Sequence, residues 1–177
     1  MTGEQRTRSC PVTPREVALR RERYEVLYRL TAREVMNADL GSMAFIPPHL
    51  PMDELLELLL GVDHAWVRLS PGAGRRVVSV VLRQDLLRAL EPGHRSYSGL
   101  SAVRFRSLAH GSADCACCFH EGRVLHPVRP NAACREVLGL MARKGILYVP
   151  VVEGEELVGE IGAADVLRAL RRVRAGG

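Results

Sequence analysis

The sequence lacks any long apolar stretch. No hydrophobic run in its 177 residues approaches the roughly 18 residues that a membrane-spanning helix needs. The first ten residues, MTGEQRTRSC, also lack the apolar segment of a secretory signal peptide. Hydrophobic residues make up 47% of the chain and charged residues 25%, proportions that suit a soluble domain with a core. We therefore expect a cytoplasmic protein that does not enter a membrane.

Lysine is almost absent, because Lys144 is the only lysine among 25 basic residues and all the others are arginines. Arginine is the better residue for paired contacts to phosphate. The net charge is +5, but the positive residues are spread along the chain and not gathered in one block. This distribution does not favour a nucleic-acid partner, and we expect none.

A catalytic set is also lacking. The six histidines are scattered along the chain. No nucleophile stands in the sequence with a base and a third residue to orient that base. We therefore expect that the protein is not an enzyme.

The cysteines do not form the two Cys-x-x-Cys pairs of a zinc ribbon. Four of the five lie in the second half of the chain, and three of these lie within the segment 110–122, HGSADCACCFHEG. Thiolates and imidazoles are ligands for zinc and for iron–sulfur clusters. The candidate ligands are Cys115, Cys117, Cys118 and His120, with His110 or His126 as further candidates. The alternative is a redox-sensitive or simply buried cysteine cluster.

One pattern occurs twice. RRVVSVVLRQDLLRAL begins at Arg75, and EELVGEIGAADVLRAL begins at Glu155. Each copy passes from charged residues into an apolar strand and ends in Leu-Arg-Ala-Leu, with Asp85 and Asp165 in the same place. Recurrence of this kind at a fixed offset indicates a repeated structural unit.

The match extends upstream of both copies. Each copy is preceded by a proline-led segment whose apolar residues recur at three- and four-residue spacing, which predicts a helix of about three turns. A run of strand type and a turn then lead to the last strand. The paired segments are 48–56 and 130–138 for the helix, 65–69 and 146–152 for the strand, and 71–74 and 153–155 for the turn.

We therefore predict an α/β fold of two strand–helix–strand–strand–helix units related by a pseudo-two-fold axis. A unit of this size has little core of its own, so the two units should pack sheet against sheet and share one. The predicted organisation is an N-terminal extension over residues 1–30, a first repeat over 31–95, and a second repeat over 96–177. The second repeat contains the Cys-rich insertion at about 110–122.

Residues 13–30, TPREVALRRERYEVLYRL, predict a helix in the N-terminal extension. Thr13 and Glu16 have the spacing of a capping box, and Pro14 suits the first helical position. The helix is expected to pack on the repeats or to extend a dimer interface. The alternative is a basic arm for nucleic acid.

The repeated pattern resembles a tandem pair of cystathionine-β-synthase (CBS) domains, often called a Bateman module. The resemblance covers roughly residues 30–172. It is carried by TAREVM at 31–36, the proline-led helices, VPVV at 149–152 and the Asp-bearing turns. The family implies two β-α-β-β-α repeats with clefts between them that bind adenine nucleotides or S-adenosylmethionine. It also implies a regulatory role and a homodimer.

Asp85 and Asp165 are the first candidate ligand-binding residues. A carboxylate at the start of a helix can accept hydrogen bonds from both ribose hydroxyls, and the helix N-terminus favours phosphate. The alternative is that each aspartate only caps its helix. The family has Thr or Ser three residues before this Asp, where the present chain has Leu82 and Gly162. The missing hydroxyls should weaken phosphate binding more than adenosine binding, and Arg83 is a further candidate to supply charge.

The resemblance implies that the base of the ligand is held by the repeat opposite each aspartate. The residues opposite Asp165 are Ala44, His64, Ala65 and Trp66, and those opposite Asp85 are His126, Ile146, Leu147 and Tyr148. Trp66 is the only tryptophan, and it either stacks on a ligand or fills the cleft as part of the core. If one site alone is used, we expect it at Asp165, because Gly162 leaves more room than Leu82.

These observations predict a regulatory module that binds AMP, ADP, ATP or S-adenosylmethionine between its repeats and signals to a protein partner. The sequence identifies neither that partner nor the pathway. Two alternatives remain. The chain is either a metal- or redox-responsive module that uses the cysteine cluster, or a ligand-free structural module for dimerisation.

Overall fold

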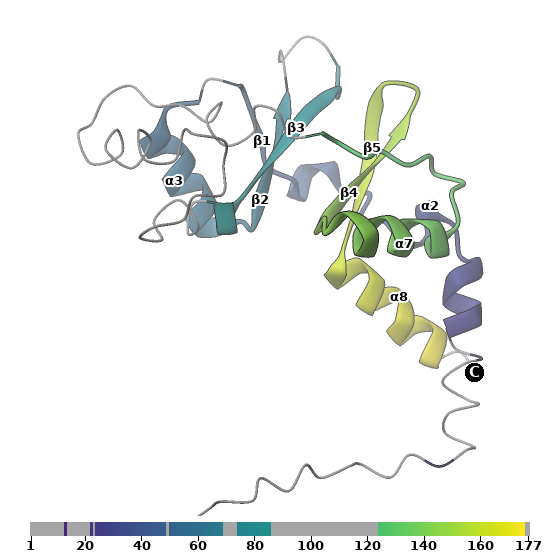
Figure 1. The fold of residues 1–177 in the computed structure, drawn as a ribbon. Helices are drawn as coiled ribbons and strands as arrows, with labels where there is room; N and C mark the ends of the chain where they lie inside the picture. The colour runs from purple at the N-terminus through teal and green to yellow at the C-terminus, as the bar shows by residue number, and fades with distance from the viewer. Residues whose placement is uncertain are drawn as a thin grey trace, which may run out of the picture.

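A computed structural model of the chain describes residues 24–48, 50–68, 74–85 and 124–175, together with Thr13 and Glu22. It is a mixed α/β structure, as predicted, with two groups of strands and helices side by side (Figure 1). The first group contains η1 (Leu40–Ser42), β1 (Phe45–Ile46), α3 (Met52–Gly61), β2 (His64–Arg68) and β3 (Val77–Leu82). The second group contains α7 (Cys134–Lys144), β4 (Tyr148–Glu153), β5 (Glu156–Gly162) and α8 (Ala163–Ala175), with α2 (Ala32–Val35) from the N-terminal side.

The first repeat is a three-stranded sheet in the order β1-β2-β3, with β1 parallel to β2 and β2 antiparallel to β3. Helix α3 begins after Pro51, and Asp53 and Glu54 lie in its first turn, where the helix dipole favours acidic side chains. The helix buries Leu55 and Leu59 against the sheet. The core of this repeat consists of Ile46, Leu55, Leu59, Ala65, Val67 and Val81.

The second repeat has the same plan. Strands β4 and β5 form an antiparallel pair, and Val128 bridges in parallel to β4 at Val151, the place that β1 takes in the first repeat. Helix α7 ends at Gly145, which has the left-handed backbone (φ 63°) that glycine adopts without strain. Its N–H donates to the carbonyl of Met141 and closes the last turn.

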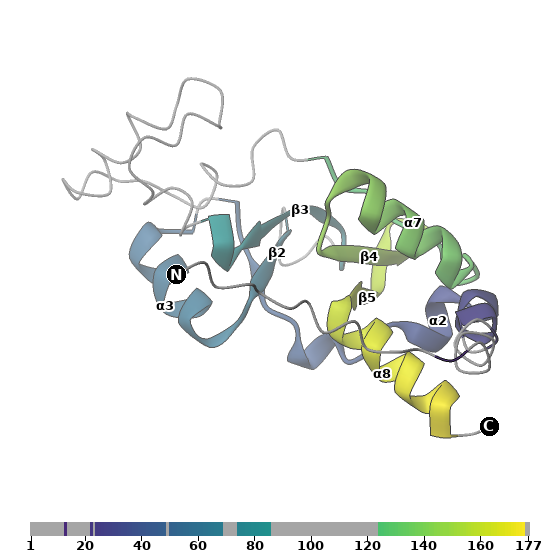
Figure 2. The same ribbon diagram turned by 60° about the horizontal axis from the view of Figure 1, so that its bottom comes forward.

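The segment before the first repeat packs in the core of the second. Thr31 bridges to Ala133, and Asn37 exchanges backbone hydrogen bonds of 2.9 and 3.0 Å with Glu160 on β5. Helix α2 lies against α7 and α8 in both views (Figures 1 and 2). The buried residues of this core are Leu27, Ala32, Val35, Cys134, Val137, Val149, Val151, Ile161 and Ala169. Residues 27–37 therefore lie next to the first repeat in sequence but belong to the second in packing, while the repeat boundaries 31–95 and 96–177 stay a prediction.

Equivalent positions of the two repeats lie 80 residues apart from the turn before the last strand onward, and 84 residues apart in the strand before that turn. Gly74 and Gly154 have nearly the same left-handed φ, 66° and 65°. His64 pairs with Leu82 across its sheet as Tyr148 pairs with Gly162. His64 and Tyr148 are therefore equivalent, and their rings stack on each other with centroids 3.7 Å apart. This contact between equivalent residues is what a pseudo-two-fold axis between the repeats requires.

The two repeats share a third core, as predicted, but each repeat also has a core of its own, contrary to the expectation that it would have little. Its buried residues come from both halves and are Met43, Trp66, Val80, Leu82 and Leu157. Strand β5 also meets the turn before β3, since the Leu157 N–H donates to the Arg75 carbonyl at 3.1 Å.

The predicted N-terminal helix is described only in part. Residues 24–29 are helical, Leu27 is buried, and Tyr24 stacks on Tyr28. Glu16, with which Thr13 was predicted to form a capping box, lies outside the described residues, as does the insertion at 110–122. Among the described helices, none has the length and hydropathy to cross a membrane.

Candidate functional site

Both repeated aspartates lie where a strand passes into a helix. Asp165 is the third residue of α8, and its Oδ2 accepts a hydrogen bond of 2.7 Å from the Gly162 N–H. Asp85 Oδ2 accepts the equivalent bond of 3.1 Å from the Leu82 N–H. This is one half of a capping box, in which an acidic residue bonds the backbone of the residue before the helix. The capping role that the sequence left open is therefore present at both positions.

The other half of that capping box would be a Ser or Thr hydroxyl at Gly162 and Leu82. A threonine does occupy this position at α2, where the Thr31 N–H and hydroxyl both donate to the Glu34 carboxylate at 2.7 Å. These two bonds hold the pKa of Glu34 below its ordinary value. Neither repeated aspartate can have such a partner, because Gly162 and Leu82 have no hydroxyl.

The second oxygen of Asp165 is held by an arginine. Its Oδ1 accepts a hydrogen bond from Arg168 Nη2, one turn further along α8. The Asp165 side chain is only 7% exposed, whereas the Arg168 side chain is 65% exposed. The carboxylate is therefore buried, while the side chain that bonds its Oδ1 lies mostly in solvent.

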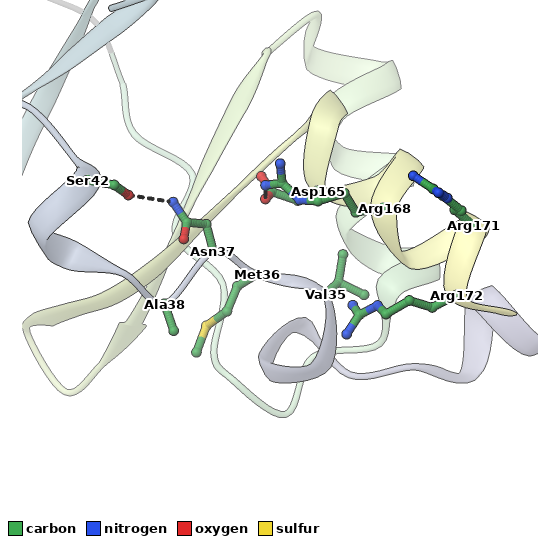
Figure 3. Close-up of a pocket in the computed structure, with 9 residues that line it drawn as sticks. All are labelled: Val35, Met36, Asn37, Ala38, Ser42, Asp165, Arg168, Arg171 and Arg172. Atoms are coloured by element: carbon green, nitrogen blue, oxygen red, sulfur yellow. Dashed lines mark hydrogen bonds and ion pairs between the residues drawn. The ribbon is translucent and has the colours of Figure 1, made fainter. Parts of the chain in front are cut away.

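A cleft of about 780 Å³ opens beside Asp165. Figure 3 shows it between the start of α8 and the segment that follows α2. Its walls are Val35, Met36, Asn37, Ala38, Ser42, Asp165, Arg168, Arg171 and Arg172. The volume lies within the range of small-molecule sites in proteins, about 300–1,000 Å³. Three arginines and one aspartate make the cleft electropositive.

The polar groups of this cleft are partly fixed by local bonds. Arg172 Nη2 donates to the Glu34 carbonyl at 2.8 Å, which holds Arg172 against the end of α2. On the opposite wall, Asn37 Nδ2 donates to Ser42 Oγ at 3.2 Å (Figure 3). Sequence reasoning did not select these residues, because the first repeat and its preceding segment gave no sign that they approach α8.

The residues predicted to hold a base opposite Asp165 do not line this cleft. Trp66 is fully buried in the core between the repeats, and its Nε1–H donates to Glu160 Oε2 at 2.6 Å. His64 Nε2 lies 2.7 Å from the same oxygen. Ala65 is buried in the core of the first repeat, and the carbonyl of Ala44 accepts the Trp66 N–H. The sequence left open whether Trp66 stacks on a ligand or fills the cleft, and in the structure its ring is part of the core between the repeats.

Glu160 is a buried charged residue that the sequence analysis did not select. Burial raises its pKa, but the hydrogen bond and charge of His64 and the bonds from Trp66 and Asn37 outweigh burial and hold the pKa below its ordinary value. Glu160 is equivalent to Val80, so a carboxylate replaces an apolar residue in the middle of a strand. That difference between the two copies was the available signal.

The residues around Asp85 are arranged differently. Arg83 Nε donates to the carbonyls of Leu59 and Val62 at 2.7 and 3.2 Å, so its guanidinium closes the end of α3. It also pairs with Asp63 at 3.2 Å. Leu82 is buried in the shared core.

The predicted base-binding residues opposite Asp85 have different exposures. His126 and Ile146 are half-buried, and Leu147 is exposed. Burial, with the nearby carboxylates Asp63, Glu160 and Asp165, raises the pKa of Tyr148. The Tyr148 ring also occupies the space beside Gly162, since a Cβ there would lie 2.9 Å from the ring.

The predicted metal ligands Cys115, Cys117, Cys118 and His120 lie outside the described residues. Within the part of the chain that the structure does describe, no group of three or more His, Cys, Asp or Glu side chains is placed to hold a metal ion. Cys134 is buried in the core of the second repeat, and burial raises the pKa of its thiol.

Comparisons with known proteins agree with this architecture. The model of the CBS domain family matches residues 32–92 and 123–172, which together are more than half of the chain. A search of curated proteins found no match.

Several solved structures share the fold. CBSX2 in complex with AMP is 20% identical, with 81% of this chain and 98% of that chain covered and a TM-score of 0.61. The CBS domain of a bacterial CNNM/CorC family Mg²⁺ transporter in complex with ATP is 17% identical, with 89% and 98% covered and a TM-score of 0.62. A conserved protein from Pyrococcus horikoshii is 20% identical, with 82% and 95% covered and a TM-score of 0.60. At these identities the structures show a common fold, and the two-segment match of the family model shows that the chain belongs to the CBS domain family.

Proposed function

We propose that this chain is a regulatory module that binds an adenosine-containing nucleotide in the cleft beside Asp165 and passes the change to a protein partner. The observation that carries the proposal is the placement of Asp165, Arg168, Arg171 and Arg172 around one cleft of about 780 Å³. Two chains of the same fold were solved with AMP and with ATP, which supports a ligand of this class.

The chemistry of the cleft suits both ends of such a ligand. A carboxylate accepts hydrogen bonds from vicinal hydroxyls, and charge-assisted bonds of this kind are worth about 1.5–3 kcal/mol each. Arginine presents a planar fork of donors that matches phosphate oxygens. The arginines of α8 therefore supply phosphate contacts in place of the hydroxyl that is missing at Gly162.

The first experiment is a thermal-shift screen of the full chain with AMP, ADP, ATP, NAD and S-adenosylmethionine, followed by titration calorimetry. A ligand that binds only the folded chain raises its melting temperature in proportion to the logarithm of concentration. The decisive variant is Asp165→Asn, which keeps an oxygen that can accept the Gly162 N–H but loses the charge. We expect it to weaken binding at least about tenfold, equivalent to 1.4 kcal/mol.

Asp85→Asn is the matched control, because Asp85 has the same capping geometry in the other repeat. If Asp165→Asn and Asp85→Asn bind the nucleotide equally well and as tightly as the wild type, Asp165 is only a cap. If no compound of the screen binds the wild type, the proposed function is wrong.

A second candidate is a structural module that dimerises without ligand. It is supported by two apolar residues at the predicted ligand clefts, since Trp66 is fully buried and bonded to Glu160, and Leu82 is buried in the shared core. Sedimentation of the full chain distinguishes the two. A stable homodimer with no thermal shift from any nucleotide favours the structural module.

A further inference from the structure

We infer that Arg168 makes the cleft selective for nucleoside polyphosphates, an inference that rests on the proposed function. In this structure Arg168 occupies Oδ1 of Asp165, the oxygen that a ribose hydroxyl would need. Phosphate groups entering the cleft draw the guanidinium away from the carboxylate and leave Oδ1 for the ribose. The same residue therefore competes with the nucleoside part of a ligand and attracts its phosphate part.

Both oxygens of the Asp165 carboxylate already accept hydrogen bonds. Its Oδ2 is committed to the Gly162 N–H at 2.7 Å, a bond that belongs to the helix start and that a ligand cannot replace without disturbing α8. Its Oδ1 is bonded to Arg168. A ligand hydroxyl therefore gains the carboxylate most readily by displacing Arg168.

The two partners of this ion pair differ in their exposure to solvent. The Asp165 side chain is 7% exposed, whereas Arg168 is 65% exposed. Water around the exposed guanidinium screens this ion pair and weakens it. Arg168 can therefore leave the carboxylate when another anion is offered. The buried carboxylate stays where it is, because its capping bond fixes it.

The charge of the cleft decides which anion that is. Arg168, Arg171 and Arg172 stand three and four residues apart on α8, a spacing that puts them on one face of the helix. Figure 3 shows all three beside the same cleft. Like charges at this spacing repel each other, so an anion placed among them is favoured. Arg172 is already bonded to the Glu34 carbonyl, which holds one guanidinium at the wall.

The candidate ligands should therefore differ in their affinity for the cleft. Adenosine has to displace Arg168 and has no anionic group that could pair with the displaced guanidinium. ATP displaces it and pairs it with phosphate. S-adenosylmethionine brings a positive sulfonium group towards three arginines, which disfavours it. We therefore expect ATP to bind more tightly than AMP, and AMP more tightly than adenosine or S-adenosylmethionine.

Calorimetry of the full chain with adenosine and with ATP tests the inference, using Arg168→Ala, Arg171→Ala and Arg143→Ala. Arg168→Ala should tighten adenosine binding about two- to fivefold, because the competing ion pair is gone. It should weaken ATP binding about tenfold or more, because a charge-assisted bond to phosphate is lost. Arg171→Ala should weaken ATP only. Arg143, in the last turn of α7 and outside the cleft, is the control and should change neither.

The opposite signs at Arg168 are what a merely structural residue would not produce. If Arg168→Ala weakens both ligands in parallel, or changes neither while ATP still binds the wild type, the inference is wrong and the proposed function stands. If neither the wild type nor any variant binds adenosine or ATP, the inference is wrong, and the proposed function is wrong as well if AMP, ADP, NAD and S-adenosylmethionine also fail to bind. Melting of each variant without ligand identifies a loss of fold, and in that case Arg168→Gln in the same pair of titrations decides.

Discussion

Replacing Glu160 by valine should destabilise the interface between the two repeats. Valine is the residue that the first repeat has at the equivalent position, Val80, so the change tests the carboxylate and not the backbone. Glu160 Oε2 accepts the Trp66 Nε1–H at 2.6 Å and lies 2.7 Å from His64 Nε2. The glutamate, the tryptophan and the histidine are all buried or nearly so.

The magnitude follows from the groups left behind. A buried donor that loses its partner costs about 1–3 kcal/mol, and Glu160→Val affects two of them. We therefore expect Glu160→Val to lower the free energy of unfolding by about 3 kcal/mol. Glu160→Gln keeps the volume and one acceptor oxygen, so it should lower the free energy by about 1–2 kcal/mol.

Urea unfolding measures this difference, with the midpoint and the slope fitted separately. A double-mutant cycle with Trp66→Phe should show coupling of at least about 0.5 kcal/mol, because the two residues share one hydrogen bond. The reasoning is wrong if Glu160→Val is as stable as the wild type, or if the effects of Glu160→Val and Trp66→Phe simply add.

Four further predictions concern pH, a helix end and two glycines. Because the pKa of Glu160 in the folded chain lies below its ordinary value of 4.5, its contribution to stability is present above pH 4.5 and lost as the pH falls through the folded value. Urea midpoints across this range should therefore fall more steeply for the wild type than for Glu160→Gln. Arg83→Ala should lower the melting temperature, with a loss of about 1 kcal/mol, because the carbonyls at the end of α3 lose their donor. Gly162→Ala should lower the free energy of urea unfolding by about 1–2 kcal/mol, because its Cβ would lie 2.9 Å from the Tyr148 ring. Gly139→Ala should raise it by about 0.5–1 kcal/mol, because the nearest atoms to its Cβ belong to the flexible Arg143 side chain and alanine favours a helix.

Each of these has a control and a contrary result. Arg76 pairs with Glu155 at the surface, so Arg76→Ala should change stability by less than about 0.5 kcal/mol. Equal effects of Arg83→Ala and Arg76→Ala would show that the guanidinium of Arg83 does not support α3. A Gly162→Ala variant as stable as Gly139→Ala would mean that Tyr148 moves aside at no cost. A wild type whose urea midpoint is flat below pH 4.5 would contradict the pKa assigned to Glu160.

The candidate site was predictable in part. Asp165 was selected because its copy in the other repeat stands at the same junction of strand and helix. The arginines of α8 were not, since Arg168 has a counterpart in the first copy, Arg88, and nothing in the sequence separates a solvated arginine from one beside a cleft. Met36 and Asn37 were passed over because residues more than 100 positions away supply the other wall.

The order of strands and helices, the existence of two repeats and the places of the two aspartates were determined by the sequence alone. These features depend on local periodicity, on proline and glycine at turns, and on recurrence at a fixed offset, all of which are written along the chain. The tertiary structure alone decided that residues 27–37 pack with the second repeat, that Trp66 fills the interface, and that Arg168 covers Asp165. Two similar sheets offer similar apolar faces, so local pattern cannot say which one a segment covers. That choice depends on buried partners such as Glu160, whose hydrogen bonds join residues 94 and 96 positions apart.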